Sequence, residues 1–217
     1  MIVIGYCHGA DVAYCFHESL IRAIAELGPD VIGHIQGVAA GAMGLDRARN
    51  EICERFLETK AEWLLFIDAD MQFKPQDIRK LLLSAHPTKR PVVGGLCFKL
   101  QGMNPEYGPV LVPTIFKDSA PVMDYSGMQR CDATGAAFLL IHRSVLRRMK
   151  TNWFSYHSSQ EHISEDWAFC NRLGELGIPL YVNTEVKIGH QKSIILEERD
   201  FISLVERLKG TVTSAAP

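Results

Sequence analysis

Residues 62–71 read Glu-Trp-Leu-Leu-Phe-Ile-Asp-Ala-Asp-Met, and this stretch decides the fold class. An unbroken apolar run from Trp63 to Ile67 ends in two carboxylates, Asp68 and Asp70. A short apolar run of this kind predicts a strand buried on both faces of a sheet. Because side chains at positions i and i+2 leave a strand on the same side, the two carboxylates are expected to point together. They would do so at the carboxyl end of a central strand, where open α/β sheets bind ligands.

Paired carboxylates at a strand end indicate a candidate metal site. Two ionised carboxylates side by side repel each other unless a cation lies between them. Oxygen ligands with open coordination positions suit Mg²⁺ or Mn²⁺ shared with substrate phosphates. The structural alternative is a turn that begins at one aspartate while its neighbour caps the next helix.

The composition is that of one ordinary globular domain. The chain has 217 residues, of which 47% are hydrophobic and 22% charged, with a net charge of −2. These values allow a sizeable core and give no electrostatic argument for general nucleic-acid binding. No apolar run approaches the roughly 18 residues of a membrane span, and residues 1–5 enter a strand without the features of a signal peptide. We therefore expect a soluble, cytoplasmic protein.

The six cysteines are scattered along the chain and form no C-x-x-C pair. This pattern argues against a zinc ribbon and against a thioredoxin-like redox site. Several of the cysteines lie in apolar patterns, so we expect small buried residues with free thiols.

Strand and helix patterns alternate through the first hundred residues. The expected strands are residues 2–5, 31–35, 63–67 and 91–97. Such alternation is typical of a mostly parallel sheet with helices on both faces. The sequence therefore predicts an α/β fold.

Three helices are expected between these strands. The first spans residues 11–25, is stopped by Gly28-Pro29, and has an expected apolar face of Val12, Phe16, Leu20 and Ile24. The second spans residues 46–57, with an expected apolar face of Ala48, Ile52 and Phe56. The third begins at Pro75, because proline is favourable in the first turn of a helix.

The second half of the chain begins with a segment rich in glycine and proline, residues 99–130. We expect a long loop there, with one strand at Val110–Phe116. The remaining expected elements are a strand at 136–141, a helix from Ser144, a helix at 164–176, a strand at 181–188, a helix at 194–208 and a loose tail at 210–217.

Four polar motifs follow one another along the chain. They are Asp68-Ala69-Asp70, the stretch 132–140 (Asp-Ala-Thr-Gly-Ala-Ala-Phe-Leu-Leu), Ser164-Glu165-Asp166-Trp167 at a helix start, and Gly189-His190 after a strand. Upstream of them, residues 46–50 read Asp-Arg-Ala-Arg-Asn. Over roughly residues 2–192, this series resembles the GT-A glycosyltransferases, in particular family 2-like enzymes that use nucleotide-sugar donors.

The resemblance implies a GT-A fold, which is a nested Rossmann-like, mostly parallel mixed sheet with helices on both faces. It implies a single catalytic domain over residues 1–209, with a nucleotide-binding half at 1–98, an acceptor-binding half at 99–209 and a flexible tail at 210–217. The implied reaction is the transfer of a sugar, of the hexosyltransferase type, from a nucleoside-diphosphate sugar to an acceptor hydroxyl. The acceptor stays open among glycans, proteins, lipids and modified nucleic acids, and so does the stereochemical outcome.

By resemblance, the Asp-x-Asp motif holds the Mn²⁺ or Mg²⁺ ion that bridges the donor diphosphate. Asp70 is the first choice for a direct ligand, while Asp68 is expected to reach the metal through water or to contact the ribose. His190 is implied as the third protein ligand, and its imidazole suits Mn²⁺ better than Mg²⁺. The alternative for a lone histidine is a structural position in the core or on the surface.

The acidic helix start implies the catalytic base. An inverting transfer needs a carboxylate that accepts the proton of the acceptor hydroxyl, and Asp166 is the candidate. Glu165 is the adjacent alternative and is expected to contact the acceptor or the donor sugar. Both acids also suit the first turn of a helix capped by Ser164, so a capping role is compatible with the catalytic one.

The donor is expected to lie against several short segments. Tyr6, after the first strand, is placed either to stack on the base or to pack in the core, and Arg49 is placed to pair with phosphate. Gln36 lies where the family often has an acid that reads uracil, so the nucleotide stays open. The full set of implied donor contacts is Tyr6, His8, Arg49, Asn50, Asp68, Ala69, Gly95, Gly135 and Ala136.

Two other classes of function compete with a transferase. A sugar nucleotidyltransferase would share Rossmann-like sheets and aspartate–metal sites, but residues 6–11 contain no Lys or Arg to form its basic phosphate loop. A sugar-nucleotide or glycan-binding module without catalysis would retain the fold. The presence of Asp70, Asp166 and His190 argues against such a loss of function.

Overall fold

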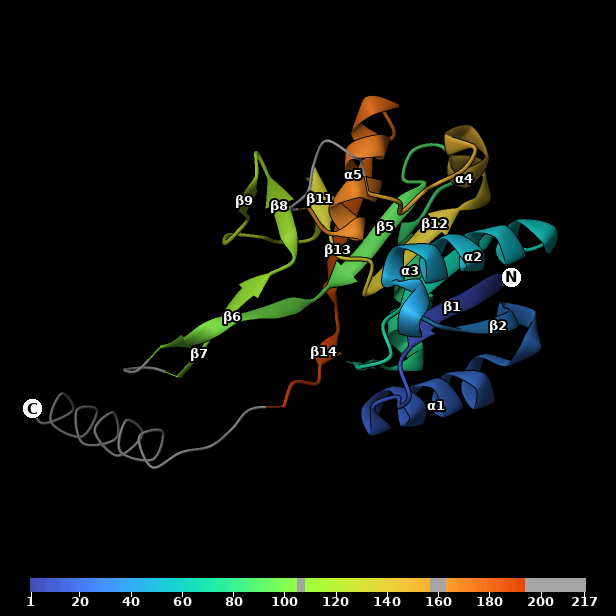
Figure 1. Cartoon of the computed structure of the whole chain (residues 1–217), viewed down its shortest axis with the longest axis horizontal. Coiled ribbons are helices and arrows are strands. Elements are labelled where there is room, and N and C mark those ends of the chain that lie inside the picture. Colours follow the sequence, from blue (N-terminus) through green and yellow to red (C-terminus); the bar gives the residue numbers. More distant parts are fainter. Residues whose placement is uncertain (105–107, 157–162, 194–217) are drawn as a thin grey trace, which may run out of the picture.

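The computed structural model describes residues 1–104, 108–156 and 163–193. Its centre is a seven-stranded sheet with the strand order β10-β13-β5-β12-β3-β1-β2, and helices cover both faces of that sheet (Figure 1). The expected helix at 194–208 and the tail at 210–217 lie outside the described residues. The strands of the central sheet are β1 (Ile2–His8), β2 (Ile32–Ala39), β3 (Trp63–Ile67), β5 (Val92–Leu96), β10 (Met128–Cys131), β12 (Phe138–His142) and β13 (Leu180–Lys187).

The strand directions make this sheet mixed. Strand β1 is parallel to both β2 and β3, and β13 is parallel to β5. Strand β12 lies between β3 and β5 and is antiparallel to both, while β10 is antiparallel to β13. The mostly parallel mixed sheet expected for a GT-A fold is confirmed.

Helices divide the core into two layers, one on each face of the sheet. Side chains of α2, α4 and α5 pack on one face, and side chains of α1 and α3 pack on the other. Strand β3 serves both layers, because Leu64 and Phe66 point to the first while Leu65 and Ile67 point to the second. The helices are α1 (Tyr14–Val31), α2 (Leu45–Glu58), α3 (Pro75–Ser84), α4 (Arg143–Met149) and α5 (Glu165–Glu175), with a short 3-10 turn at Gly41–Met43.

The expected apolar face of the first helix is wrong by about one position. The helix begins at Tyr14, later than expected, and its buried residues are Phe16, Ser19, Ala23 and Leu27. Ile24 is 44% exposed. Ser19 is on the buried face because its hydroxyl accepts a hydrogen bond from the backbone N–H of Phe73 at 3.1 Å. The stop expected at Gly28 is found as a break with a φ of 66°, after which a last turn leads into β2.

The expected apolar face of the second helix is confirmed. Ala48, Ile52 and Phe56 of α2 are all fully buried. The same face of this helix also carries a charged residue, Arg49, which is only 1% exposed. A buried charge requires partners, and those partners define the candidate site described below.

The segment expected to be a long loop is mostly strand. Strands β6 (Phe98–Asn104) and β7 (Gly108–Pro113) form an antiparallel ribbon that extends from the body of the molecule (Figure 1). The glycines and prolines lie at bulges and strand ends, for example Gly102 at a shift in the β6–β7 register. A three-stranded sheet follows, made of β8 (Ile115–Lys117), β9 (Ala120–Pro121) and β11 (Ala133–Thr134).

A separate two-stranded sheet joins the segment after β3 to the segment after β13. Strand β4 (Met71–Gln72) pairs antiparallel with β14 (Gly189–His190), with Met71 opposite His190. This pairing carries residues near 190 to the turn that follows β3. It therefore brings the Asp-x-Asp motif and the C-terminal histidine together.

Two further expectations bear on the general character of the chain. The six cysteines are free thiols, as expected, and all except Cys15 are buried. Among the helices within the described residues, none is long and apolar enough to cross a membrane.

Candidate functional site

A surface pocket of about 340 Å³ lies at the carboxyl ends of β1 and β3. This is the edge at which open α/β sheets bind ligands. Three of the implied donor contacts, His8, Asp68 and Ala69, line the pocket together with Asp70. The complete lining is Cys7, His8, Gly9, Asp11, Ala13, Ala40, Leu45, Asp68, Ala69 and Asp70.

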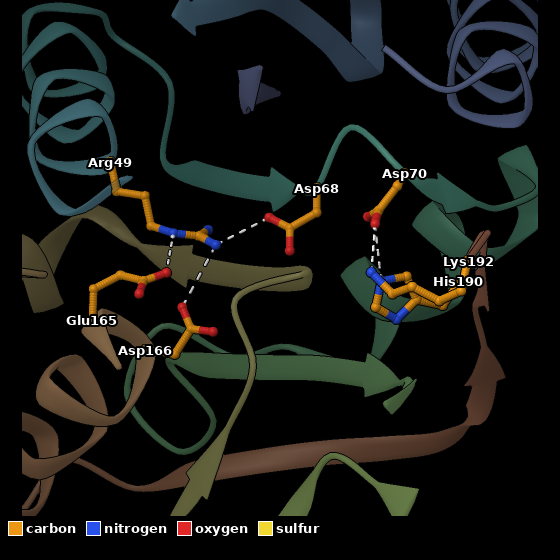
Figure 2. Close-up of polar contacts among 7 residues, drawn as sticks. All are labelled: Arg49, Asp68, Asp70, Glu165, Asp166, His190 and Lys192. Atoms are coloured by element: carbon orange, nitrogen blue, oxygen red, sulfur yellow. Dashed lines mark hydrogen bonds and ion pairs between the residues drawn. The ribbon is translucent and has the colours of Figure 1, made fainter. Parts of the chain in front are cut away.

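The two aspartates of the motif do not act as a pair that points together from a strand. Strand β3 ends at Ile67, and the chain then turns, with the N–H of Met71 donating to the carbonyl of Asp68 at 3.1 Å. Figure 2 shows that Asp68 faces Arg49 while Asp70 faces His190 and Lys192. The expectation is wrong because the i, i+2 rule applies only inside a strand, and this strand ends before either aspartate.

Arg49 is at the centre of a buried cluster of carboxylates. Its Nη2 lies 3.0 Å from Oδ1 of Asp68 and 3.6 Å from Oδ1 of Asp166, and its Nε lies 3.3 Å from Oε1 of Glu165. The guanidinium also lies 5.5 Å from the ring centre of Phe66 and 5.6 Å from that of Phe154. Such ring contacts are favourable for a cation that has lost its water.

The charges of this cluster change one another's ionisation. Burial acts to lower the pKa of Arg49, but the three carboxylates outweigh that effect and hold the pKa above its ordinary value. Burial raises the pKa of Asp166 to about 7. The positive charge of Arg49 acts to lower this pKa, and the negative charges of Glu165 and Asp68 add to the rise. One guanidinium cannot neutralise three carboxylates, so this end of the sheet carries excess negative charge when all three are ionised.

The start of α5 presents its two acids differently. The hydroxyl of Ser164 caps the helix by accepting from the N–H of Trp167 at 3.5 Å, which agrees with the structural alternative. The side chain of Glu165 is 8% exposed and held by Arg49, whereas that of Asp166 is 20% exposed. Oδ1 of Asp166 is buried without a hydrogen-bond partner among the described residues, its closest approach being the 3.6 Å contact with Arg49.

A second cluster surrounds Asp70. Its Oδ2 lies 3.0 Å from Nε2 of His190 and 2.8 Å from Nζ of Lys192 (Figure 2). The other ring nitrogen of His190, Nδ1, lies 2.8 Å from the carbonyl oxygen of Phe98. Because a carbonyl can only accept, Nδ1 carries a proton, and Nε2 is the nitrogen presented to Asp70.

The ionisation of this pair follows from its hydrogen bonds. Partial burial acts to raise the pKa of Asp70, but the hydrogen bonds from His190 and Lys192 outweigh burial and lower it to about 2. The hydrogen bond to Asp70 in turn raises the pKa of His190, against the effect of its own partial burial. Asp70 is therefore an anion that already attracts cations.

The donor atoms of Asp70 and His190 fit a divalent cation. Neighbouring ligands of an octahedral ion with bonds of about 2.1 Å lie about 3 Å apart, and the observed separation of Oδ2 and Nε2 is 3.0 Å. A histidine fixed through its other nitrogen by a backbone carbonyl is the usual arrangement of a metal ligand. The implied set of three ligands is nevertheless not assembled, since Asp68 faces Arg49, and within the described residues no group of three or more His, Cys, Asp and Glu is arranged to hold a metal.

Other implied donor contacts lie away from open surface. The ring of Tyr6 packs 5.0 Å from that of Phe16 and fills the space above Gly37, whose Cβ would lie 2.7 Å from it. Gly95 is buried, and a Cβ there would meet core side chains at 3.0–3.1 Å. Tyr6 therefore packs in the core, which is the second of the two roles expected for it. No feature of this arrangement supports a donor contact at Gly95.

The last three implied contacts have structural neighbours of their own. The side chain of Asn50 accepts from the N–H of Phe154 at 3.0 Å and donates to Oγ of Ser155 at 2.9 Å, so it fixes that loop. Gly135 lies beside the candidate base, because a Cβ there would be 3.7 Å from Oδ2 of Asp166. Ala136 is buried, and its backbone hydrogen-bonds to Asp166. Their contacts with a donor stay predictions.

Lys192 is the residue of this site that sequence reasoning missed. The available signal was its spacing, because a long side chain two residues beyond His190 is near enough to reach the partners of that histidine. A lysine two residues after a candidate metal ligand is therefore expected to reach the same partner. The observed contact of Lys192 with Asp70 matches that spacing.

Comparison with known proteins identifies the family. The model of glycosyl transferase family 2 matches residues 38–152, which is just over half of the chain. This match includes Arg49, Asp68 and Asp70 and ends before α5 begins. A search of curated proteins found no significant match.

Solved structures share the fold at low sequence identity. The crystal structure of A197 from STIV is 16% identical, with a TM-score of 0.55 over 90% of this chain and 96% of that one. The structure of GalNAc-T7 with UDP, GalNAc and Mn²⁺ is 8% identical, with a TM-score of 0.61 over 89% of this chain but only 44% of that one. The family match and the shared architecture agree, and the chain belongs to glycosyl transferase family 2, with a GT-A fold.

Proposed function

We propose that this chain transfers a sugar from a nucleoside-diphosphate sugar to an acceptor hydroxyl, with Asp70 and His190 holding a divalent cation, Mn²⁺ or Mg²⁺. The observation that carries the proposal is the meeting of these two side chains at 3.0 Å although they are 120 residues apart in sequence. They meet beside a pocket of suitable position for a donor. GalNAc-T7, which shares the fold, was solved with UDP, GalNAc and Mn²⁺, and this supports a nucleotide sugar and a divalent cation as the proposed ligands of this chain.

The cation would neutralise the charge that the nucleoside diphosphate gains as it leaves the sugar. The protein contributes an ionised carboxylate at Asp70 and an imidazole whose free direction is set by the carbonyl of Phe98. His8 and Ala69 lie in the same pocket, so the donor is proposed to occupy it. The nucleotide-binding half is proposed to be residues 1–98.

Asp166 is proposed as the base that accepts the proton of the acceptor hydroxyl. Its carboxylate is partly exposed, and one of its oxygens lacks a hydrogen-bond partner among the described residues. Its raised pKa brings it closer to the ideal range of a general base at neutral pH. Glu165 is less suited to the role, because it is more buried and its oxygen is engaged by Arg49. The acceptor-binding half is proposed to be residues 99–209.

Arg49 is proposed as a positioning residue and not as a ligand of the donor phosphate. Its side chain is almost completely buried, and its hydrogen-bonding nitrogens are directed to carboxylates. It connects the end of β3, through Asp68, with the start of α5, through Glu165 and Asp166. It therefore fixes where the proposed base lies relative to the proposed donor pocket.

The proposed function predicts a metal-dependent response to one class of donor. In a thermal-shift screen with Mn²⁺ against UDP-, GDP- and dTDP-sugars, we expect one nucleotide to raise the melting temperature. A ligand at 100 times its dissociation constant stabilises the native state by about 2.7 kcal/mol. The same sugar nucleotide with EDTA serves as the control, and the absence of a shift with every donor would contradict donor binding.

The proposed base predicts a separation of turnover from binding. Asp166→Asn removes the group that accepts the proton, so turnover should fall by about 10²–10⁴-fold, while affinity for the donor should stay within about twofold, because the lost proton transfer belongs to the transition state. Glu175→Gln, an exposed acid at the other end of the same helix, is the matched control and should retain full turnover. Turnover of Asp166→Asn near the wild-type rate would show that another group is the base.

The proposed role of Arg49 predicts a pH-dependent loss of stability. Arg49→Met leaves buried carboxylates unpaired, which should cost about 3–5 kcal/mol near neutral pH in urea unfolding. Arg49 acts to lower the raised pKa of Asp166, so without Arg49 the folded-state pKa of Asp166 rises further above its unfolded value. The folded variant then binds more protons than the unfolded chain, so its deficit should shrink as pH falls.

Arg55→Met is the matched control for this experiment. Arg55 lies on the same helix but is half exposed and forms a surface ion pair with Glu51, so its loss should change stability by less than about 0.5 kcal/mol. Arg49→Lys keeps the positive charge, and its stability is measured instead if the Arg49→Met variant does not fold. A deficit of Arg49→Met that is as small as that of Arg55→Met, or that is the same at every pH, would contradict the role given to Arg49.

A further inference from the structure

One oxygen atom, Oδ2 of Asp70, receives two positively charged or protonated partners. Nε2 of His190 lies 3.0 Å from it and Nζ of Lys192 lies 2.8 Å from it (Figure 2). The side chain of Asp70 is 36% exposed and that of Lys192 is 44% exposed, so both can exchange partners with solvent ions. His190, at 19%, is more enclosed.

The backbone holds Lys192 at this position. His190 pairs with Met71 in the sheet of β4 and β14, and the N–H of Gln191 donates to the carbonyl of Asp70 at 2.9 Å. His190 and Lys192 therefore flank a residue that is bonded directly to the Asp70 backbone, and both of their side chains contact Oδ2 of Asp70. The paired strand ends at His190, and the hydrogen bond of Gln191 then holds the backbone next to Lys192 close to Asp70.

The two partners differ in what they can do for a metal. The imidazole of His190 offers a lone pair on Nε2 once that nitrogen has no proton, so it can become a ligand. The ammonium of Lys192 has three donors and no lone pair, so it can only repel a metal. Oδ2 already accepts from both groups, so a cation has to replace them. His190 can stay beside the cation as a ligand once Nε2 loses its proton, whereas the ammonium of Lys192 has to move away.

Building on the proposed metal site, we propose that Lys192 and the divalent cation compete for Oδ2 of Asp70. In the metal-free protein Lys192 balances the charge of Asp70 and keeps the carboxylate directed toward His190. When the cation binds, the ammonium of Lys192 moves off Oδ2, while the backbone of the neighbouring Gln191 stays hydrogen-bonded to Asp70. Lys192 thereby lowers the affinity of the empty site for metal, because two cations a few ångströms apart repel each other.

The test measures metal binding and requires no substrate. Lys192→Met retains most of the side-chain length without the charge. We expect it to bind Mn²⁺ about three- to tenfold more tightly than the wild type. Binding is followed from the free Mn²⁺ signal in electron paramagnetic resonance, at fixed pH and ionic strength and without nucleotide. Lys192→Arg keeps a cation in place and should bind Mn²⁺ within about twofold of the wild type.

Lys89→Met is the matched control for loss of one positive charge. Lys89 is exposed and precedes β5, which runs in the same direction as β3 because both are antiparallel to β12. It therefore lies at the opposite end of the sheet from Asp70, and its removal should leave Mn²⁺ affinity unchanged. His190→Ala removes the proposed ligand and should weaken binding.

The outcomes separate this inference from the proposed function. Tighter binding by Lys192→Met, with Lys89→Met unchanged, supports the competition. Equal or weaker binding by Lys192→Met, with a wild type that binds Mn²⁺ through His190, overturns the competition and leaves the metal site standing. No Mn²⁺ binding by either the wild type or Lys192→Met overturns both.

Discussion

A single buried guanidinium holds the candidate site together. Arg49 lies on a helix of the first half of the chain, and its partner Glu165 lies 116 residues later at the start of α5. The rings of Phe66 and Phe154 exclude water around it, which strengthens each of its ion pairs. A charge buried to this extent is tolerated only with its partners in place, so the position of α5 against the end of β3 is tied to this one interaction.

The two aspartates of the Asp-x-Asp motif divide between two cation-bearing clusters. Asp68 belongs to the Arg49 cluster, whose guanidinium is buried, and Asp70 belongs to the His190 and Lys192 cluster, whose lysine is exposed to solvent. The turn after β3 makes this division possible, because it sends the two side chains in different directions. Negative charge is in excess around Arg49, and the partners of Asp70 are exchangeable. The excess negative charge attracts a further cation, and the exchangeable partners of Asp70 make this residue the one at which the cation can bind.

The parts of the fold that follow from local pattern were predictable from sequence. Strand β3 matches its expected residues, α3 begins at Pro75, and Ser164 caps α5. The buried face of α1 was not predictable, because Ser19 is inside only through its hydrogen bond to the backbone of Phe73. The ribbon of β6 and β7 was not predictable either, because glycines and prolines at bulges and strand ends produce the same pattern as a loop.

The same distinction applies to the site. Motifs in the sequence predict candidate acids, but the positively charged residue that each acid meets depends on three-dimensional packing, as Arg49 and Lys192 show. The measurement that tests the central claim most directly is anomalous diffraction at the manganese edge, from crystals grown with Mn²⁺ and a nucleoside diphosphate. We predict a peak about 2.1 Å from both Oδ2 of Asp70 and Nε2 of His190. A peak bonded to neither atom, or no peak, would contradict the claim that these two residues form the metal site.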